Sequence, residues 1–63
     1  MVELNGKVVI VTGGAMGMGA ATAELIAECG GKVVIADFNE EKGKEETKKI
    51  VDAGGEAAFV KVD

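Results

Sequence analysis

Four glycines fall within a short stretch near the start of the chain, Thr12–Gly19 (TGGAMGMG). Where a strand passes into a helix, unpaired backbone amides and the helix dipole point at one spot and can hold a pyrophosphate. Because side chains would obstruct that approach, we expect Gly13 to form the tight turn, Gly17 to let the backbone touch phosphate, and Gly19 to let the helix pack closely. A tight turn without a ligand is the alternative.

An acidic residue stands where a nucleotide ribose would be recognised. Asp37 directly follows the apolar run Lys32–Ala36. Its carboxylate can accept hydrogen bonds from ribose hydroxyls while repelling a 2′-phosphate. Neither Met16 nor Phe38 is a basic residue that could neutralise such a phosphate. The sequence therefore favours NAD over NADP as the cofactor. Asp37 could also serve as the N-cap of the helix that follows.

These residues need strands and helices to position them, and the chain alternates between the two patterns. The runs Lys7–Thr12 and Lys32–Ala36 are apolar at consecutive positions, which is typical of parallel strands buried on both faces, and Glu56–Val62 shows a weaker form of this pattern. We therefore predict an α/β fold: a Rossmann-type βαβαβ unit with a parallel three-stranded sheet, part of a doubly wound fold, forming one dinucleotide-binding segment over residues 1–63. The expected strands are Lys7–Thr12, Lys32–Ala36 and Glu56–Val62, and the expected helices are Gly17–Cys29 and Glu40–Ala53.

The expected helices carry apolar residues at helical spacing. Asn39 is the expected N-cap of the second helix. Right-handed crossovers that step in one direction place both helices on one face of the sheet, so the other apolar face is left bare. We therefore expect self-association or cover by the rest of a longer protein. The residues at helical spacing, which form the expected apolar stripe of each helix, are Met18, Ala21, Leu25, Ile26 and Cys29 in the first helix, and Gly43, Thr47, Ile50 and Val51 in the second.

Composition narrows the partners and the compartment. Eleven acidic against seven basic residues give a net charge of −4, which disfavours nucleic acid or an anionic membrane as a partner. The longest apolar run, Val8–Val11, is too short to span a bilayer, and the start does not resemble a signal peptide. The lone Cys29 excludes an internal disulfide and fits a packing role better than a reactive one, and the absence of His disfavours a zinc site. We expect a cytoplasmic protein.

The spacing TGxxxGxG resembles the fingerprint of the short-chain dehydrogenase/reductase family. The lead-in LNGKVVIVT, the acidic Asp37, and the turn Ala53–Gly55 are similar to the same family's pattern. The resemblance implies cofactor contacts along the loop and at the two later strand ends, with Asp63 bonding the adenine amino group unless it is simply a frayed terminus. The implied cofactor-binding residues are Gly13, Met16, Gly17, Met18, Gly19, Asp37, Phe38 and Asp63, although Met16 departs from the small, polar or basic residue of many members.

Family members are much longer, and their catalytic Ser, Tyr and Lys lie beyond residue 63. This sequence contains neither Ser nor Tyr, so we expect no catalytic residue within it. The resemblance implies the NAD(H)-binding portion of an NAD-dependent oxidoreductase that moves hydride between an alcohol or ketone and nicotinamide. One alternative is a stand-alone mini-Rossmann module that binds an adenine nucleotide without catalysis. Another, a fragment of an S-adenosylmethionine-dependent methyltransferase, is disfavoured by the glycine spacing.

Overall fold

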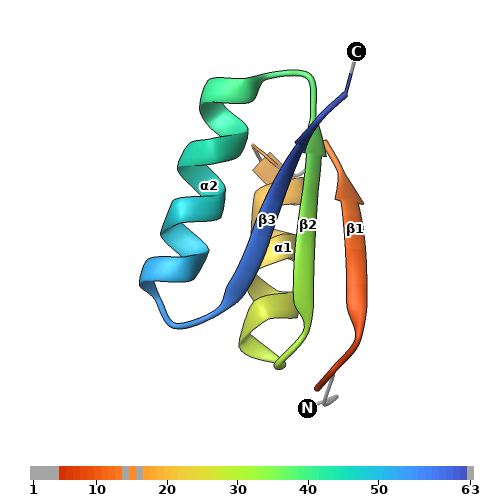
Figure 1. Cartoon of the computed structure of the whole chain (residues 1–63), viewed down its shortest axis with the longest axis vertical. Coiled ribbons are helices and arrows are strands. Elements are labelled where there is room, and N and C mark those ends of the chain that lie inside the picture. Colours follow the sequence, from red (N-terminus) through yellow and green to blue (C-terminus); the bar gives the residue numbers. More distant parts are fainter. Residues whose placement is uncertain (1–4, 14, 16, 63) are drawn as a thin grey trace.

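Three parallel strands form one sheet, and two helices connect them (Figure 1). The computed structural model describes residues 5–13, 15 and 17–62. The strands lie in the order β1-β2-β3. This arrangement confirms the predicted Rossmann-type βαβαβ unit, with element ends that differ from the expected ones by about a residue, as is usual for such boundaries. The elements are β1 (Val8–Thr12), α1 (Gly17–Glu28), β2 (Lys32–Asp37), α2 (Glu40–Asp52) and β3 (Glu56–Lys61).

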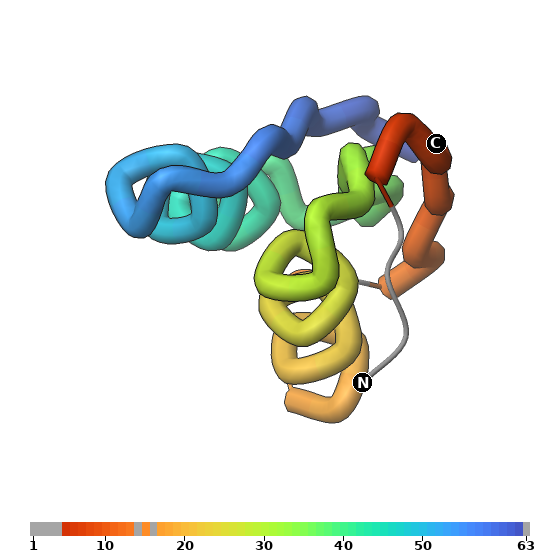
Figure 2. Tube along the Cα trace, turned by 90° about the horizontal axis from the view of Figure 1, so that it is seen from below, coloured from red at the N-terminus to blue at the C-terminus, as the bar shows by residue number. Residues whose placement is uncertain are grey.

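The core lies between the sheet and the two helices, which cover the same face of it (Figure 2). Val33 and Ile35 of the central strand point to this face and are completely buried. The register places Val9 and Ala57 on either side of Val33, so one apolar row crosses the sheet beneath the helices. Burying such a row is the main favourable contribution that so small a sheet can make to folding.

The opposite face of the sheet is apolar and bare. Ile10 keeps 65% of its surface exposed, and Val8 and Val60 are also more than half exposed. The register brings Ile10 beside Val34 and Val34 beside Ala58, so these side chains form a continuous apolar surface. The expectation of two helices on one face and an uncovered second face is confirmed for the part of the chain that the structure describes.

Helix α1 buries only part of the apolar stripe that the sequence predicted: Ile26 packs against the core as expected, whereas Ala21 is exposed. Ala23 is fully buried against the sheet, with Ile26 and Ala27 packed beside it. Met18 keeps 87% of its surface exposed and Leu25 is also exposed, so their expected places in the buried stripe are wrong. The physical reason is close approach: small side chains let the helix backbone come near the sheet, whereas larger ones would hold it away.

Helix α2 also buries one residue that the predicted stripe omitted. Gly43 and Ile50 are buried as expected, but the third buried residue is Glu46, and Val51 keeps about half of its surface exposed. Thr47 is half-buried, and its hydroxyl donates a hydrogen bond to the carbonyl of Gly43 at 2.8 Å.

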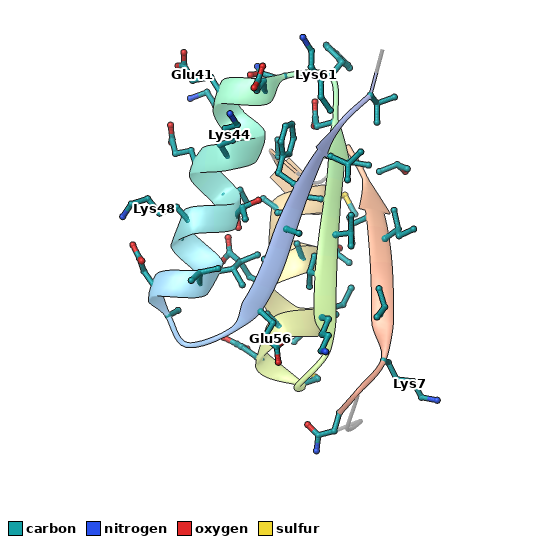
Figure 3. All side chains as sticks on the ribbon, in the orientation of Figure 1. Lys7, Glu41, Lys44, Lys48, Glu56 and Lys61 are labelled. Carbon is teal, nitrogen blue, oxygen red and sulfur yellow. The ribbon has the colours of Figure 1, made fainter. Side chains whose placement is uncertain are left out.

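The other side of α2 is a charged, solvated surface (Figure 3). Lys44 pairs with Glu40 at 2.9 Å and Lys48 with Asp52 at 2.7 Å, both one helical turn apart. Such exposed pairs contribute little to helix stability, because water and salt screen their attraction. The N-cap prediction is confirmed, because the side chain of Asn39 accepts a hydrogen bond from the amide of Lys42 at 3.0 Å.

Candidate nucleotide-binding site

The glycine loop lies between β1 and α1, at the carboxyl edge of the sheet. Gly13 and Gly17 adopt left-handed backbone angles, with φ of +67° and +59°. Residues with a side chain rarely adopt these angles, so the loop requires glycine at both positions. A Cβ added at either glycine would meet no atom of the described residues within 4 Å, so space adjoins the backbone here. This arrangement fits the phosphate loop expected from the sequence.

The loop is joined to the end of the neighbouring strand. The register pairs Thr12 with Ala36, which brings the last residues of β1 and β2 to the same level. Immediately beyond, the amide of Gly13 donates a hydrogen bond to the carbonyl of Ala36 at 2.7 Å. Parallel strands that end together bring the residues following them to one edge, which is where open α/β sheets bind their ligands.

Asp37 is the last residue of β2 and lies against the loop. Its carboxylate accepts hydrogen bonds from two backbone amides, that of Asn39 at 2.9 Å and that of Ala15 at 3.3 Å. The helix-capping alternative for Asp37 is wrong, since Asn39 caps α2. Ala15 is buried, whereas Asp37 is only half-buried. Asp37 therefore bonds a buried part of the loop while remaining partly accessible to solvent. The acidic residue thus stands at the edge where the glycine loop begins.

The other expected cofactor residues divide into exposed, half-buried and undescribed ones. Met18 in the first turn of α1 and Phe38 after β2 both project into solvent, with Phe38 keeping 78% of its surface exposed. Gly19 is half-buried on α1. Met16 and Asp63 lie outside the described residues, so their expected roles stay predictions. The hydrogen bond from the amide of Ala15 to the carboxylate of Asp37 was not predicted from the sequence. The position of Ala15 between the loop glycines was the signal that could have indicated it.

Away from this edge, the buried carboxylate of Glu46 on α2 faces the partly exposed carboxylate of Glu24 on α1. Glu46 on α2 is only 7% exposed, and its Oε2 has no hydrogen-bond partner among the described residues. Burial, followed by a hydrogen bond with Glu24 and the charge of Glu24, raises the pKa of Glu46 to about 7. The hydrogen bond from Glu46 lowers the pKa of Glu24, whose carboxylate also lies 3.4 Å from the ammonium of Lys49. The position of Glu46 between Gly43 and Ile50 on one helical face was the signal that could have revealed it.

One cavity among the described residues lies away from the glycine loop. It has a volume of about 300 Å³ and is lined by residues near the carboxyl ends of α1 and α2, including Glu28 and Ala53. Within the described part of the chain, no three His, Cys, Asp or Glu residues are grouped to hold a metal ion. No helix in that part is both long and apolar enough to cross a membrane. The candidate site at the carboxyl edge rests on the left-handed glycines of the loop and on the carboxylate of Asp37 that bonds it.

Comparisons of sequence relate this chain to known enzymes. A family model described as short chain dehydrogenase matches residues 7–63. A 2,5-dichloro-2,5-cyclohexadiene-1,4-diol dehydrogenase of Sphingobium indicum is 53% identical over 61 residues, which are 97% of this chain and 24% of the relative. Tropinone reductase-like 1 of Erythroxylum coca is 50% identical over 61 residues, 97% of this chain and 21% of its own. The chain thus spans less than a quarter of the length of these curated relatives.

Comparisons with solved structures also match this chain to a dehydrogenase and to a short-chain oxidoreductase. A citronellol catabolism dehydrogenase of Pseudomonas aeruginosa matches with a TM-score of 0.93 and 35% identity, over 95% of this chain and 25% of its own. A metagenomic short-chain oxidoreductase, solved in complex with NADP, matches with a TM-score of 0.92 and 40% identity, over 95% of this chain and 27% of its own. The same βαβαβ unit therefore forms about a quarter of each of these larger enzymes.

Proposed function

This chain belongs to the short-chain dehydrogenase family, and we propose that it is the NAD(H)-binding portion of an oxidoreductase that transfers hydride between an alcohol or ketone and nicotinamide. One observation carries the proposal: the carboxylate of Asp37 stands beside the glycine loop at the carboxyl edge of the sheet. A phosphate-binding turn and a ribose acceptor are the two features that a dinucleotide requires from the first half of its site.

The described residues fit such a ligand. The open space beside Gly13 and Gly17 lets an anion approach the backbone, and the start of α1 supplies a positive dipole end toward it. In our proposal the loop binds the pyrophosphate and Asp37 orients the adenosine ribose. The exposed side chains of Met18 and Phe38 would be partly covered by the bound nucleotide. When bound, the nicotinamide supplies the carbon that accepts or releases hydride.

We assign NAD rather than NADP as the cofactor because of charge. A 2′-phosphate would lie close to the Asp37 carboxylate, where two like charges repel each other. The next residue, Phe38, carries no positive charge to compensate. A relative of known structure was solved with NADP, so the choice between these two cofactors is the sharpest test of the role given to Asp37.

The proposal divides the reaction between this chain and the rest of a larger enzyme. The sequence holds no Ser or Tyr, so the proton-transferring residues are assigned to a part of the enzyme beyond these residues. That remainder, or a second copy of the chain, would cover the bare face of the sheet. We place the protein in the reducing cytoplasm because its single cysteine, Cys29, is free.

Isothermal titration with NAD and with NADP tests the proposal. We expect NAD to bind more tightly by about tenfold, a difference of about 1.4 kcal/mol. Nicotinamide mononucleotide, which lacks the adenosine half, is the matched control and should bind more weakly than NAD. Equal or tighter binding of NADP would refute the role given to Asp37, and no binding of either dinucleotide would refute the proposed function.

A further inference from the structure

The carboxylate of Asp37, at the end of β2, bonds both the turn that directly follows it and the glycine loop, which is distant in the sequence. One oxygen, Oδ1, accepts a hydrogen bond from the amide of Asn39 in the turn before α2. The other oxygen, Oδ2, accepts one from the amide of Ala15, which lies 22 residues earlier in the glycine loop. These segments meet at the upper edge of the sheet in Figure 1, where β1 and β2 end.

The bond to Ala15 reaches a part of the loop that the strand itself does not hold. The amide of Gly13 is fixed by the carbonyl of Ala36, as a direct continuation of the ladder between β1 and β2. Ala15 lies two residues further along, after the left-handed turn at Gly13, and its partner is a side chain instead of backbone. Glycine turns are conformationally permissive, so a tether beyond the turn restricts which loop shapes are populated.

We propose that Asp37 is a positioning residue for the phosphate loop as well as the ribose acceptor, and that it holds the loop in place through the amide of Ala15. This inference rests on the proposed function for its biological meaning. The two roles are compatible, because each carboxylate oxygen offers two lone pairs and can accept from an amide and a hydroxyl together. The same carboxylate then shapes the phosphate half of the site and recognises the ribose half.

The positioning role predicts an effect in the absence of any nucleotide. In Asp37→Ala, the amide of Ala15 loses its acceptor, so its hydrogen exchange should accelerate by about tenfold or more, as expected for loss of a bond to a charged group. The amide of Gly13 should keep its protection, because its acceptor is the backbone of Ala36. Residue-resolved hydrogen exchange on the full chain, measured without ligand, provides this readout.

Two further variants separate loop positioning from general loss of structure. Asp37→Asn preserves the shape of the side chain but leaves one acceptor where there were two, so either Ala15 or Asn39 should lose protection while the other retains it. Asn39→Ala removes the cap on the amide of Lys42 without touching the Asp37–Ala15 bond, and should leave Ala15 exchange unchanged. Unchanged protection of both amides in Asp37→Asn, or of Ala15 in Asp37→Ala, would overturn the proposal.

A separate titration with NAD distinguishes this inference from the proposed function. If Ala15 protection depends on Asp37 but NAD does not bind, the positioning role stands and the proposed function fails. If NAD binds and Ala15 exchange is indifferent to Asp37, the carboxylate acts on ribose alone and the positioning role is wrong.

Discussion

The ring of Phe59 on β3 occupies the space that a side chain at position 43 of α2 would need. A Cβ built on Gly43 would overlap three carbons of this ring. Phe59 sits beside Ile35 in the sheet register and packs against the buried core. The glycine inside α2 is therefore explained by close packing between helix and strand, even though glycine is among the poorest helix formers.

We predict that Gly43→Ala destabilises the protein despite improving helix propensity. The substitution gains about 1 kcal/mol of intrinsic helix preference. Overpacking a tight contact typically costs about 1–3 kcal/mol, so we expect a net fall in the free energy of unfolding. Urea denaturation measures it, with Glu45→Ala on the exposed side of α2 as a control that should change little. A Gly43→Ala protein more stable than the wild type would contradict the contact with Phe59.

The buried carboxylate of Glu46 should make stability depend on pH. Its pKa in the folded chain is about 7, against an ordinary value of 4.5, so the folded state binds this proton more tightly than the unfolded state does. This contribution is complete below pH 4.5 and is lost as pH rises through about 7. Glu46→Gln should abolish that loss and raise stability above pH 7 by roughly 1–2 kcal/mol, as expected when a buried charge is removed.

Thermal unfolding at a series of pH values tests the role of Glu46. Glu41→Gln makes the same chemical change at an exposed position of α2 and should leave the pH dependence in place. If the wild type and Glu46→Gln show parallel curves between pH 4.5 and 8, the carboxylate of Glu46 is not the group that titrates.

Removing the acidic group at the end of β2 should narrow the preference between cofactors. We expect Asp37→Ala to lose about 1–2 kcal/mol of NAD binding, typical of hydrogen bonds to a charged group, and to lose less or no NADP binding. Asp52→Ala, which removes the same charge from the far end of α2, is the matched control. Titration calorimetry would contradict the prediction if both variants lowered NAD affinity equally.

The bare face of the sheet should drive association of the chain when it is alone. Ile10 lies at the centre of β1 on that face, so Ile10→Lys should shift the sedimentation profile toward monomer. Leu25→Lys introduces the same charge at an exposed apolar site on α1, and we expect it to leave association unchanged. A wild-type chain that sediments as a folded monomer at high concentration would show that this face needs no cover.

The chain by itself should not turn over any substrate. It contains no Tyr and no Ser to transfer a proton during hydride transfer. Absorbance of NADH, followed against a broad panel of alcohols and ketones, should stay at background. Turnover that persists through purification would show that residues within this chain suffice for catalysis.

The sequence by itself determined the fold class and most of the candidate site. Short apolar runs that border glycines and are separated by helical segments permit few arrangements other than parallel strands with crossovers. In such a sheet, the residue following each strand must lie at the carboxyl edge. The glycines after β1 and Asp37 at the end of β2 could therefore be assigned to one site from spacing alone, as could Asn39 as the cap of α2.

Tertiary structure alone decided which faces and atoms meet. Hydropathy identifies apolar side chains, but close approach to the sheet selected the small Ala23 and left Met18 in solvent. Helical spacing places Glu46 on the same face of α2 as Gly43 and Ile50, but its burial depends on the packing of α2 against α1 and β3. The bond from the amide of Ala15 to Asp37 joins residues 22 positions apart, and it forms only because the register of β1 with β2 brings the loop and the strand end to the same level.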